Sequence, residues 1–290
     1  SDYLVTETVQ AFQKAFELDK VTNMPRHEAE LQQYYEQQFI IELNEKMQTS
    51  YSADVFKPTT PDSKTLQALY IAENPYLSGN QERMDAANDN SNYTRNHAKY
   101  HPMLRNILEK NNWRDFYIVD TNSDTVIYSV KKNIDFGTSL STGPFKESGL
   151  SKAYFQAKTA KAGNIALADV ESFLPAYGAQ VLFMAAPVYI ADTVKAVVVI
   201  QIPNTEINRI MANDKRWQDV GLGKTGETYL VAADGTLRSE TRLFLEKKQQ
   251  YLNTLLADKV DEKTLKQIGV FESGIGLHTI NTLSVNPINN

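Results

Sequence analysis

The sequence predicts an α+β protein, with a long N-terminal helix followed by two domains that contain antiparallel sheets, the second domain being smaller. Apolar residues recur every three or four positions through residues 1–48, which is typical of one face of a helix. Short runs rich in Val, Ile, Tyr and Phe, separated by turn residues, begin at residue 115 and indicate strands. A weaker copy of the same hairpin pattern begins at residue 228.

The N-terminal helix carries one apolar stripe in each half. The stripes are Val5, Val9, Phe12 and Phe16, then Leu31, Tyr35, Phe39, Leu43 and Met47. Pro25 either kinks this helix or stands in the first turn of a second helix, with Asn23 as its cap. Because an apolar stripe needs a partner surface, we expect the helix to pack on the domains that follow and also to form a homodimer interface.

A loop and two helices are predicted before the first strand. Residues 51–63 hold Pro58 and Pro61 among Ser and Thr, which indicates a loop. We expect a short helix over residues 64–72 and a longer one over 89–109, interrupted or bent near Pro102.

Four strands are predicted in the middle of the chain, over residues 115–120, 125–130, 181–189 and 193–202. Turns at residues 122–124 and 191–192 join them into two hairpins. A helix over residues 150–161 and a middle strand over 166–172 are expected between the hairpins. This order of elements is typical of a PAS-like α+β sheet.

The last part of the chain predicts a second PAS-like unit. A helix over residues 204–213 precedes two strands, over 228–233 and 236–239, around an Asp-Gly turn. A charged helical tail follows over residues 243–267, with strand-like pieces near Val270 and Leu277. No second pair of long apolar strands follows, so this unit looks incomplete. The predicted parts are a helical segment with a loop (1–65), a first domain (66–204) and a second domain (205–290).

Composition excludes several classes of function. A formal net charge of −5 argues against binding to nucleic acid, which needs a clustered basic surface. The absence of cysteine excludes disulfides, thiolate metal sites and a catalytic thiol. No stretch approaches the roughly 20 apolar residues of a membrane helix. The four histidines are scattered, so we expect structural or pocket roles and no metal site: His27, His97, His101 and His278.

Gly221, Gly223 and Gly226 have the spacing of the dinucleotide-binding fingerprint. That fingerprint requires a helix after the glycines, whereas a strand is predicted here, so we expect a tight glycine turn and no cofactor. The chain begins at Ser1 in helical sequence without Met, and we expect it to be a fragment of a longer protein.

The most specific motif is Gly-Leu-Gly-Lys-Thr-Gly-Glu-Thr-Tyr-Leu-Val at residues 221–231, followed by the Asp-Gly turn. Together with weaker motifs that occur in the expected order, it resembles the periplasmic double Cache sensor domains of bacterial receptors. The resemblance spans about residues 66–239. Weaker matches lie at residues 66–75, 99–102, 116–120, 127–130, 135–138 and 238–239.

The resemblance implies extracytoplasmic sensing of a small molecule, on the periplasmic or extracellular face of the inner membrane. A histidine kinase is the expected output, with a chemoreceptor or a cyclase as alternatives. The first domain would be distal from the membrane and bind ligand, the second would be proximal, and the flanking transmembrane helices would lie outside this fragment. The fragment itself is expected to be non-catalytic. The Arg, Trp and Tyr arrangement of the amino-acid-binding subset is not evident, so no amino-acid ligand is inferred.

The ligand site is predicted in the first domain, for a small molecule with a carboxylate as one expected class. Eleven residues are candidates: Tyr128, Phe136, Tyr154, Phe173, Tyr177 and Phe183 as aromatic walls, Lys146, Asp169, Ser172 and again Tyr177 to orient the ligand, and Tyr100 and His101 at the entrance. One alternative is that these aromatic residues are ordinary core. Another is a hydrolase in which Asp169 and Glu171, two positions apart on a strand, perform acid–base chemistry.

Overall fold

The computed structural model describes residues 2–19, 24–76 and 78–277. The chain divides into two compact units, which are described separately. Unit 1 comprises Ser1–Asp169, Phe173–Tyr177 and Leu182–Ile202, and unit 2 comprises Val170–Ser172, Gly178–Val181 and Pro203–Asn290. None of the described helices combines the length and the apolar character that a membrane crossing requires.

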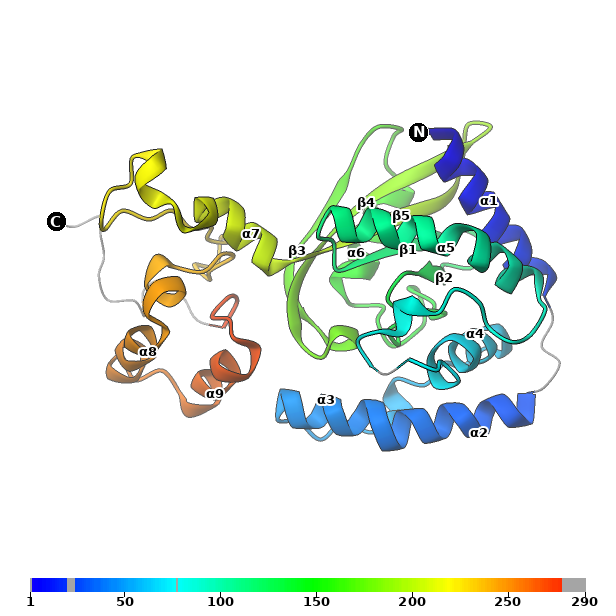
Figure 1. The fold of residues 1–290 in the computed structure, drawn as a ribbon, viewed down its shortest axis with the longest axis horizontal. Coiled ribbons are helices and arrows are strands. Elements are labelled where there is room, and N and C mark those ends of the chain that lie inside the picture. The colour runs from blue at the N-terminus through cyan, green and yellow to red at the C-terminus, as the bar shows by residue number, and fades with distance from the viewer. Residues whose placement is uncertain (1, 20–23, 77, 278–290) are drawn as a thin grey trace. The chain divides into compact units, whose positions relative to one another are not determined.

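Unit 1 holds most of the regular structure (Figure 1). Its helices are α1 (Asp2–Leu18), α2 (Met24–Tyr34), α3 (Ile40–Met47), α4 (Pro61–Gln67), α5 (Asn92–Lys110) and α6 (Gly149–Lys158). A π-helical turn, Tyr35–Phe39, joins α2 to α3, and another, Ala68–Ala72, extends α4. Pro25 is the second residue of α2, so the prediction that it opens a second helix is confirmed, whereas its proposed cap Asn23 lies outside the described residues.

The five strands form one sheet in the order β2-β1-β5-β4-β3. They are β1 (Asp115–Asp120), β2 (Val126–Ser129), β3 (Ala166–Phe173), β4 (Ala179–Ile190) and β5 (Thr193–Pro203). β1 pairs antiparallel with both β2 and β5, and Asp115 lies opposite Gln201. The predicted α+β class and its sheet are therefore confirmed. The middle strand predicted over residues 166–172 is β3, which lies at the edge of the sheet.

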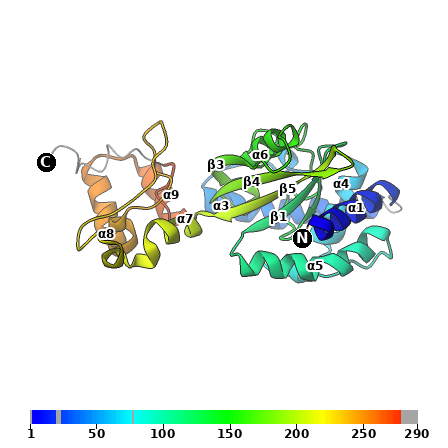
Figure 2. The same ribbon diagram turned by 90° about the horizontal axis from the view of Figure 1, so that it is seen from above.

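Helices cover both faces of the sheet (Figure 2). α6 lies on one face, and α1 and α5 lie on the other. The first apolar stripe explains this packing, because Phe12 of α1 contacts Tyr93 of α5 and Tyr128 of β2, with ring centroids 5.4 and 4.6 Å away. Gln13 on the same helix donates hydrogen bonds of 2.6 Å to Asp120 and to the carbonyl of Lys195.

The start of α5 is fixed by two separate acceptors. The hydroxyl of Ser91 accepts from the amide of Thr94 at 2.9 Å, which is an ordinary N-cap. The carboxylate of Asp19, just beyond α1, accepts from the next two free amides, those of Asn92 at 3.1 Å and Tyr93 at 2.6 Å. From there α5 continues without interruption to Lys110 with Pro102 inside it, so the predicted interruption is not found.

Unit 2 is mainly helical over its described residues. Its helices are α7 (Asn204–Met211), α8 (Arg242–Ala257) and α9 (Glu262–Phe271), which confirms the predicted helical tail but places Val270 in a helix. Between α7 and α8 the predicted strands are reduced to one isolated pair, Val231 with Leu237. Leu230 and Val231 stay 43% and 39% exposed, so no burial drives strand formation there. The predicted second sheet is therefore wrong for residues 203–277.

The predicted glycine turn is confirmed. Gly221 has φ of +81°, in the left-handed region that favours glycine. A Cβ atom on Gly226 would come within 2.3 Å of the carbonyl oxygen of Leu222, so no other residue fits there without a backbone shift.

Candidate ligand-binding site

Seven of the eleven predicted site residues lie in the interior of unit 1, each at most 5% exposed: Tyr100, His101, Tyr128, Phe136, Tyr154, Phe173 and Phe183. Lys146, Asp169 and Ser172 are exposed, and Tyr177 is partly buried. The seven buried residues do not form one group, since Tyr128 packs beneath α1 and α5, whereas Tyr154 belongs to α6.

His101 and Tyr128 form a satisfied core pair. Nε2 of His101 donates to the carbonyl of Glu82 at 2.6 Å, because a carbonyl can only accept. Nδ1 is then an acceptor for the hydroxyl of Tyr128, 2.7 Å away. Burial and, after it, the nearby charge of Lys132 lower the pKa of His101 to about 2. His101 is therefore neutral and holds α5 on the sheet.

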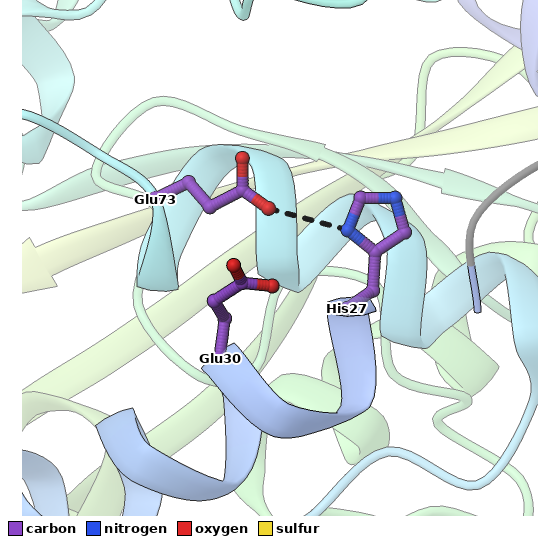
Figure 3. A group of neighbouring side chains, drawn as sticks. All are labelled: His27, Glu30 and Glu73. Carbon is purple, nitrogen blue, oxygen red and sulfur yellow. Dashed lines mark hydrogen bonds and ion pairs between the residues drawn. The ribbon is translucent and has the colours of Figure 1, made fainter. Parts of the chain in front are cut away.

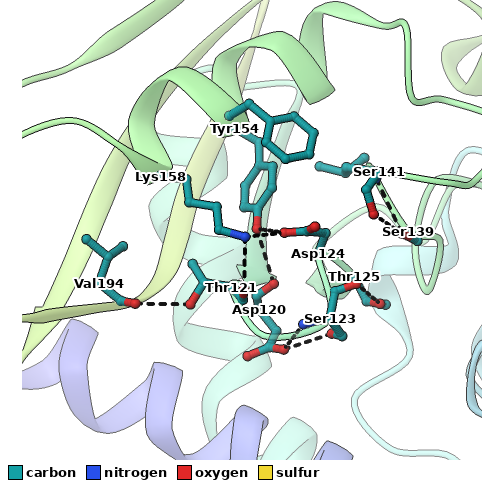
Figure 4. Close-up of polar contacts among 12 residues, drawn as sticks. Asp120, Thr121, Ser123, Asp124, Thr125, Ser139, Ser141, Tyr154, Lys158 and Val194 are labelled. Carbon is teal, nitrogen blue, oxygen red and sulfur yellow. Dashed lines mark hydrogen bonds and ion pairs between the residues drawn. The ribbon is translucent and has the colours of Figure 1, made fainter.

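Tyr154 has a similar structural role on the other face (Figure 4). Its hydroxyl contacts the carboxylate of Asp124 in the β1–β2 turn, and Lys158 of α6 donates to the same carboxylate at 2.6 Å and to the carbonyl of Thr121 at 2.9 Å. Burial alone would raise the pKa of Asp124, but the hydrogen bonds from Lys158 and Tyr154 lower it below its ordinary value. These contacts fasten α6 to the turn.

Phe173 and Phe183 belong to a row of aromatic rings that crosses unit 1. Successive centroids lie between 5.0 and 6.2 Å apart, in the order Tyr35, Phe39, Phe56, Phe145, Phe173 and Phe183. Tyr177 joins the row beside Phe39, at 5.5 Å. Tyr177 has φ of +54°, a costly conformation for a bulky residue, and Lys46 lies 4.6 Å from its ring.

The row ends at a buried polar group. The hydroxyl of Tyr35 donates to Oε1 of Gln67 at 2.7 Å, and the amide of Gln67 donates to the carbonyls of Ile134 and Phe136 at 2.9 and 2.7 Å. Gln67 thereby fixes the loop that carries Asp135 into the interior.

Asp135, Tyr117 and Gln201 are fully buried, and we call these three residues the Asp135 cluster. The hydroxyl of Tyr117 donates to Oε1 of Gln201 at 3.2 Å. Neither carboxylate oxygen of Asp135 nor Nε2 of Gln201 has a hydrogen bond of ordinary geometry. Burial, followed by the charge of Asp115, raises the pKa of Asp135 to about 7, although Tyr117 partly offsets this. Such unpartnered buried groups are uncommon in folded proteins.

Asp115 and Lys132 adjoin this cluster. Asp115 accepts hydrogen bonds from the amides of Phe116, Val130 and Lys131 and from the hydroxyl of Ser129, which offset part of the cost of its burial. Lys132 is 1% exposed and its amine lies over the ring of Tyr128, 4.4 Å from the centroid. Burial lowers the pKa of Lys132 to about 7, against the opposing charges of Asp115 and Glu82.

A second polar group lies elsewhere in unit 1 and could hold a metal ion (Figure 3). It consists of His27 and Glu30 on α2 and Glu73 after the second π-helical turn, with ligand atoms within 4.8 Å of one another. His27 and Glu73 line a cavity of about 480 Å³. None of the eleven predicted residues lines this cavity. His278 lies outside the described residues.

Local sequence patterns did not reveal the Asp135 cluster. The local sequence predicts a turn at Asp135, and it predicts ordinary strands at Tyr117 and Gln201. Tyr117 and Gln201 meet because β1 pairs with β5, a contact between segments about 80 residues apart. Gln201, which together with Lys195 interrupts an otherwise apolar run, was the one available signal.

No protein family and no curated protein matches the chain. Among solved structures, the ligand-binding domain of the Pseudomonas fluorescens chemoreceptor CtaA, in complex with L-serine, is 15% identical over 48% of this chain and 52% of that chain, with a TM-score of 0.32. The Campylobacter jejuni chemoreceptor Tlp3 domain, in complex with 4-methylisoleucine, is 14% identical over 81% and 75%, with a TM-score of 0.36. The sensor domain of the Vibrio cholerae histidine kinase DctB is 15% identical over 64% and 58%, with a TM-score of 0.29.

These structures are ligand-binding or sensor domains of bacterial receptors, the class that the sequence motifs resemble. The chain spans about half of the CtaA domain. Because the TM-scores are this low, the comparisons do not align individual residues of this chain with a known binding site. The candidate site therefore rests on the geometry described above.

Proposed function

We propose that unit 1 senses a small molecule, which binds between the aromatic row and the Asp135 cluster. The observation that carries this proposal is the group of three buried polar atoms that lack hydrogen bonds of ordinary geometry, at the end of an aromatic row. Small-molecule sites combine apolar walls with a few directed polar groups, and this interior has both. A ligand that supplies the missing hydrogen bonds removes a desolvation penalty of about 1–3 kcal/mol for each group.

The chemistry of the cluster defines the ligand class. A carboxylate accepts hydrogen bonds, so Asp135 suits an ammonium group, which would also favour its ionised form. Nε2 of Gln201 can only donate, so it suits a carboxylate or carbonyl oxygen. The proposed ligand therefore carries an amine together with an acceptor such as a carboxylate. The exposed side chain of Lys146 is not needed to bind it.

Tyr177 provides the proposed entrance to this interior. It is the partly buried member of the aromatic row, its backbone is strained, and its hydroxyl lies 3.4 Å from the hydroxyl of Ser78. Rotation of this side chain opens the row next to Phe39. A ligand that binds only one of the two arrangements shifts their populations, which is the physical requirement for a signal.

In the whole receptor this domain is extracytoplasmic and its output is a histidine kinase or a chemoreceptor signalling domain. The motif resemblance supports this assignment, together with the α+β architecture of unit 1. We further propose that α1 contributes to a homodimer, since Leu4 and Val5 on it are each 40% exposed.

The test is a thermal-shift screen of the chain with small amines, carboxylates, amino acids and sugars, followed by calorimetry. At about a hundred times its dissociation constant, a ligand stabilises the fold by about 2.7 kcal/mol. We expect compounds with both an amine and a carboxylate to give the largest shift. Asp135→Asn should abolish it, because an amide lacks the charge that binds an ammonium group.

Asp169→Asn is the matched control, since Asp169 is exposed, and it should keep the shift. A shift that survives Asp135→Asn but is lost in Asp169→Asn would overturn this site. So would a screen in which no amine or zwitterion stabilises the protein. Product formation during the incubation, measured by mass spectrometry, would favour the hydrolase alternative with Asp169 and Glu171.

A further inference from the structure

His27, Glu30 and Glu73 converge on one point (Figure 3). His27 and Glu30 are three residues apart on α2, so their side chains share a helix face. Glu73 follows the π-helical turn Ala68–Ala72 and points towards the same face. Nδ1 of His27 lies 3.2 Å from Oε1 of Glu73. The second carboxylate oxygen of Glu30, Oε2, is buried and has no hydrogen-bond partner.

The spacing of His27 and Glu73 fits a tetrahedral metal ion, and a ligand atom of Glu30 lies within 4.8 Å of both. Zinc binds imidazole nitrogen and carboxylate oxygen at about 2.0–2.2 Å, which places two of its ligand atoms roughly 3.3 Å apart. The distance between His27 and Glu73 already has this value. A single imidazole with two carboxylates and one open position is also the ligand number of catalytic-type zinc sites, which use three protein ligands.

Arg26 orients the carboxylates without occupying the metal position. Its Nε lies 3.1 Å from Oε1 of Glu30, and its Nη2 lies 3.5 Å from Oε2 of Glu73. Each glutamate therefore pairs one oxygen with Arg26 and keeps the other for a metal. Such outer partners of ligating carboxylates are common around metal ions, because they fix the direction of the remaining lone pairs.

The surroundings favour a cation. His27 and Glu73 line a cavity of about 480 Å³, whose lining also includes three aspartates, Asp19, Asp62 and Asp89. With Arg26 as the cavity's other charged residue, the lining carries excess negative charge, which attracts cations. The cavity also leaves room for water or a ligand atom at the fourth coordination position.

We propose that His27, Glu30 and Glu73 form a binding site for a divalent transition-metal ion of the Zn²⁺ type. The ion takes Nδ1 of His27, Oε1 of Glu73 and Oε2 of Glu30, and its open position faces the cavity. It joins His27 and Glu30 on α2 to Glu73, which lies more than 40 residues further along the chain. This site is separate from the Asp135 cluster and does not depend on the function proposed for it.

Zinc binding can be measured directly on the whole chain. After treatment with EDTA and buffer exchange, ZnCl₂ is titrated by calorimetry at pH 7.5, and the melting temperature is recorded with and without zinc. We expect one equivalent of Zn²⁺ to bind and to raise the melting temperature. Each of the variants His27→Gln, Glu30→Gln and Glu73→Gln should weaken binding at least tenfold, whereas MgCl₂ should bind far more weakly, since Mg²⁺ disfavours imidazole.

Glu28→Gln is the matched control. Glu28 lies on the same helix, is half exposed and pairs with Lys64, outside the proposed site. It should bind zinc as tightly as the unchanged chain. The proposal is overturned if zinc neither releases heat nor raises the melting temperature. It is also overturned if the three site variants bind zinc as tightly as Glu28→Gln, because the ion would then bind elsewhere. All variants are first compared by circular dichroism without metal, so that loss of fold is separated from loss of binding.

Discussion

Asp135 lowers the stability of the folded chain at neutral pH. Burial raises its pKa from an ordinary value of 3.8 to about 7. Between these values the unfolded chain releases a proton that the folded chain keeps, so folding is favoured at low pH and this contribution is lost as the pH rises to about 7. Buried ionisable residues with strongly shifted pKa values are common at functional sites, even where they reduce stability. Asp135 is therefore a candidate for a functional residue.

This linkage predicts the effect of Asp135→Asn on stability. The free energy of unfolding of the variant, relative to the unchanged chain, should increase by about 1.4 kcal/mol for each pH unit between pH 4 and 7. Urea unfolding of both proteins at pH 4.5 and pH 7.5 measures this difference. Equal differences at the two pH values would show that Asp135 is ionised in the folded chain. The cost of burying the asparagine amide in the variant does not depend on pH, so it is the same at both pH values and cancels in this comparison.

At the scale of residues, the sequence predicted the apolar part of the candidate site better than the polar part. Phe173 and Phe183 are in the aromatic row and Tyr177 adjoins it, because aromatic residues on strands next to turns generally face an interior. The polar partners depend on strand pairing and loop placement. Gln201 meets Tyr117 through the β1–β5 register, and Asp135 is carried in by a loop that Gln67 holds. No local pattern encodes these contacts.

At the scale of single elements, strands formed as their local sequence predicted where the same residues are also buried. The strand predicted over residues 115–120 is β1, and it is buried along almost its whole length. The segment predicted as a strand over residues 228–233 has a similar composition but stays largely exposed, and it forms only the isolated pair of Val231 with Leu237. β propensity therefore predicted strands only where a sheet was available to accept them.

The start of α5 shows that an element can also depend on a distant residue. Asp19→Ala removes the acceptor for the amides of Asn92 and Tyr93, and it removes a negative charge from the helix N-terminus. The free energy of unfolding should fall by about 1–2 kcal/mol, as for other lost caps. Urea unfolding followed by circular dichroism measures it. Glu17→Ala, an exposed neighbour in α1, is the control, and an equal loss in both variants would contradict a capping role for Asp19.

At the scale of the whole molecule, the chain has two tryptophans, and each unit contains one. Trp217 in unit 2 is 4% exposed and lies under the guanidinium of Arg242, 4.4 Å from its ring, whereas Trp113 is partly buried in unit 1. Fluorescence can therefore follow each unit separately once the other tryptophan is replaced by phenylalanine.

The glycine turn provides a test of this separation. Gly226→Ala forces a Cβ atom against the carbonyl of Leu222, so it should destabilise unit 2 by more than 1 kcal/mol. In a Trp113→Phe background, the urea midpoint reported by Trp217 should fall. In a Trp217→Phe background, the midpoint reported by Trp113 serves as the reference for unit 1. An unchanged Trp217 midpoint would show that the turn adapts to the added methyl group.

The sheet order also constrains when this protein can fold during its synthesis. β1 is hydrogen-bonded on one side to β2, which follows it closely, and on the other side to β5, which ends at Pro203. A chain emerging from the ribosome, or from a translocation channel, exposes one edge of β1 until about 80 further residues have appeared. Loop closure of this length slows folding and leaves an unpaired edge open to other chains. Chaperone binding to the nascent chain would therefore be most useful between the emergence of β1 and that of β5.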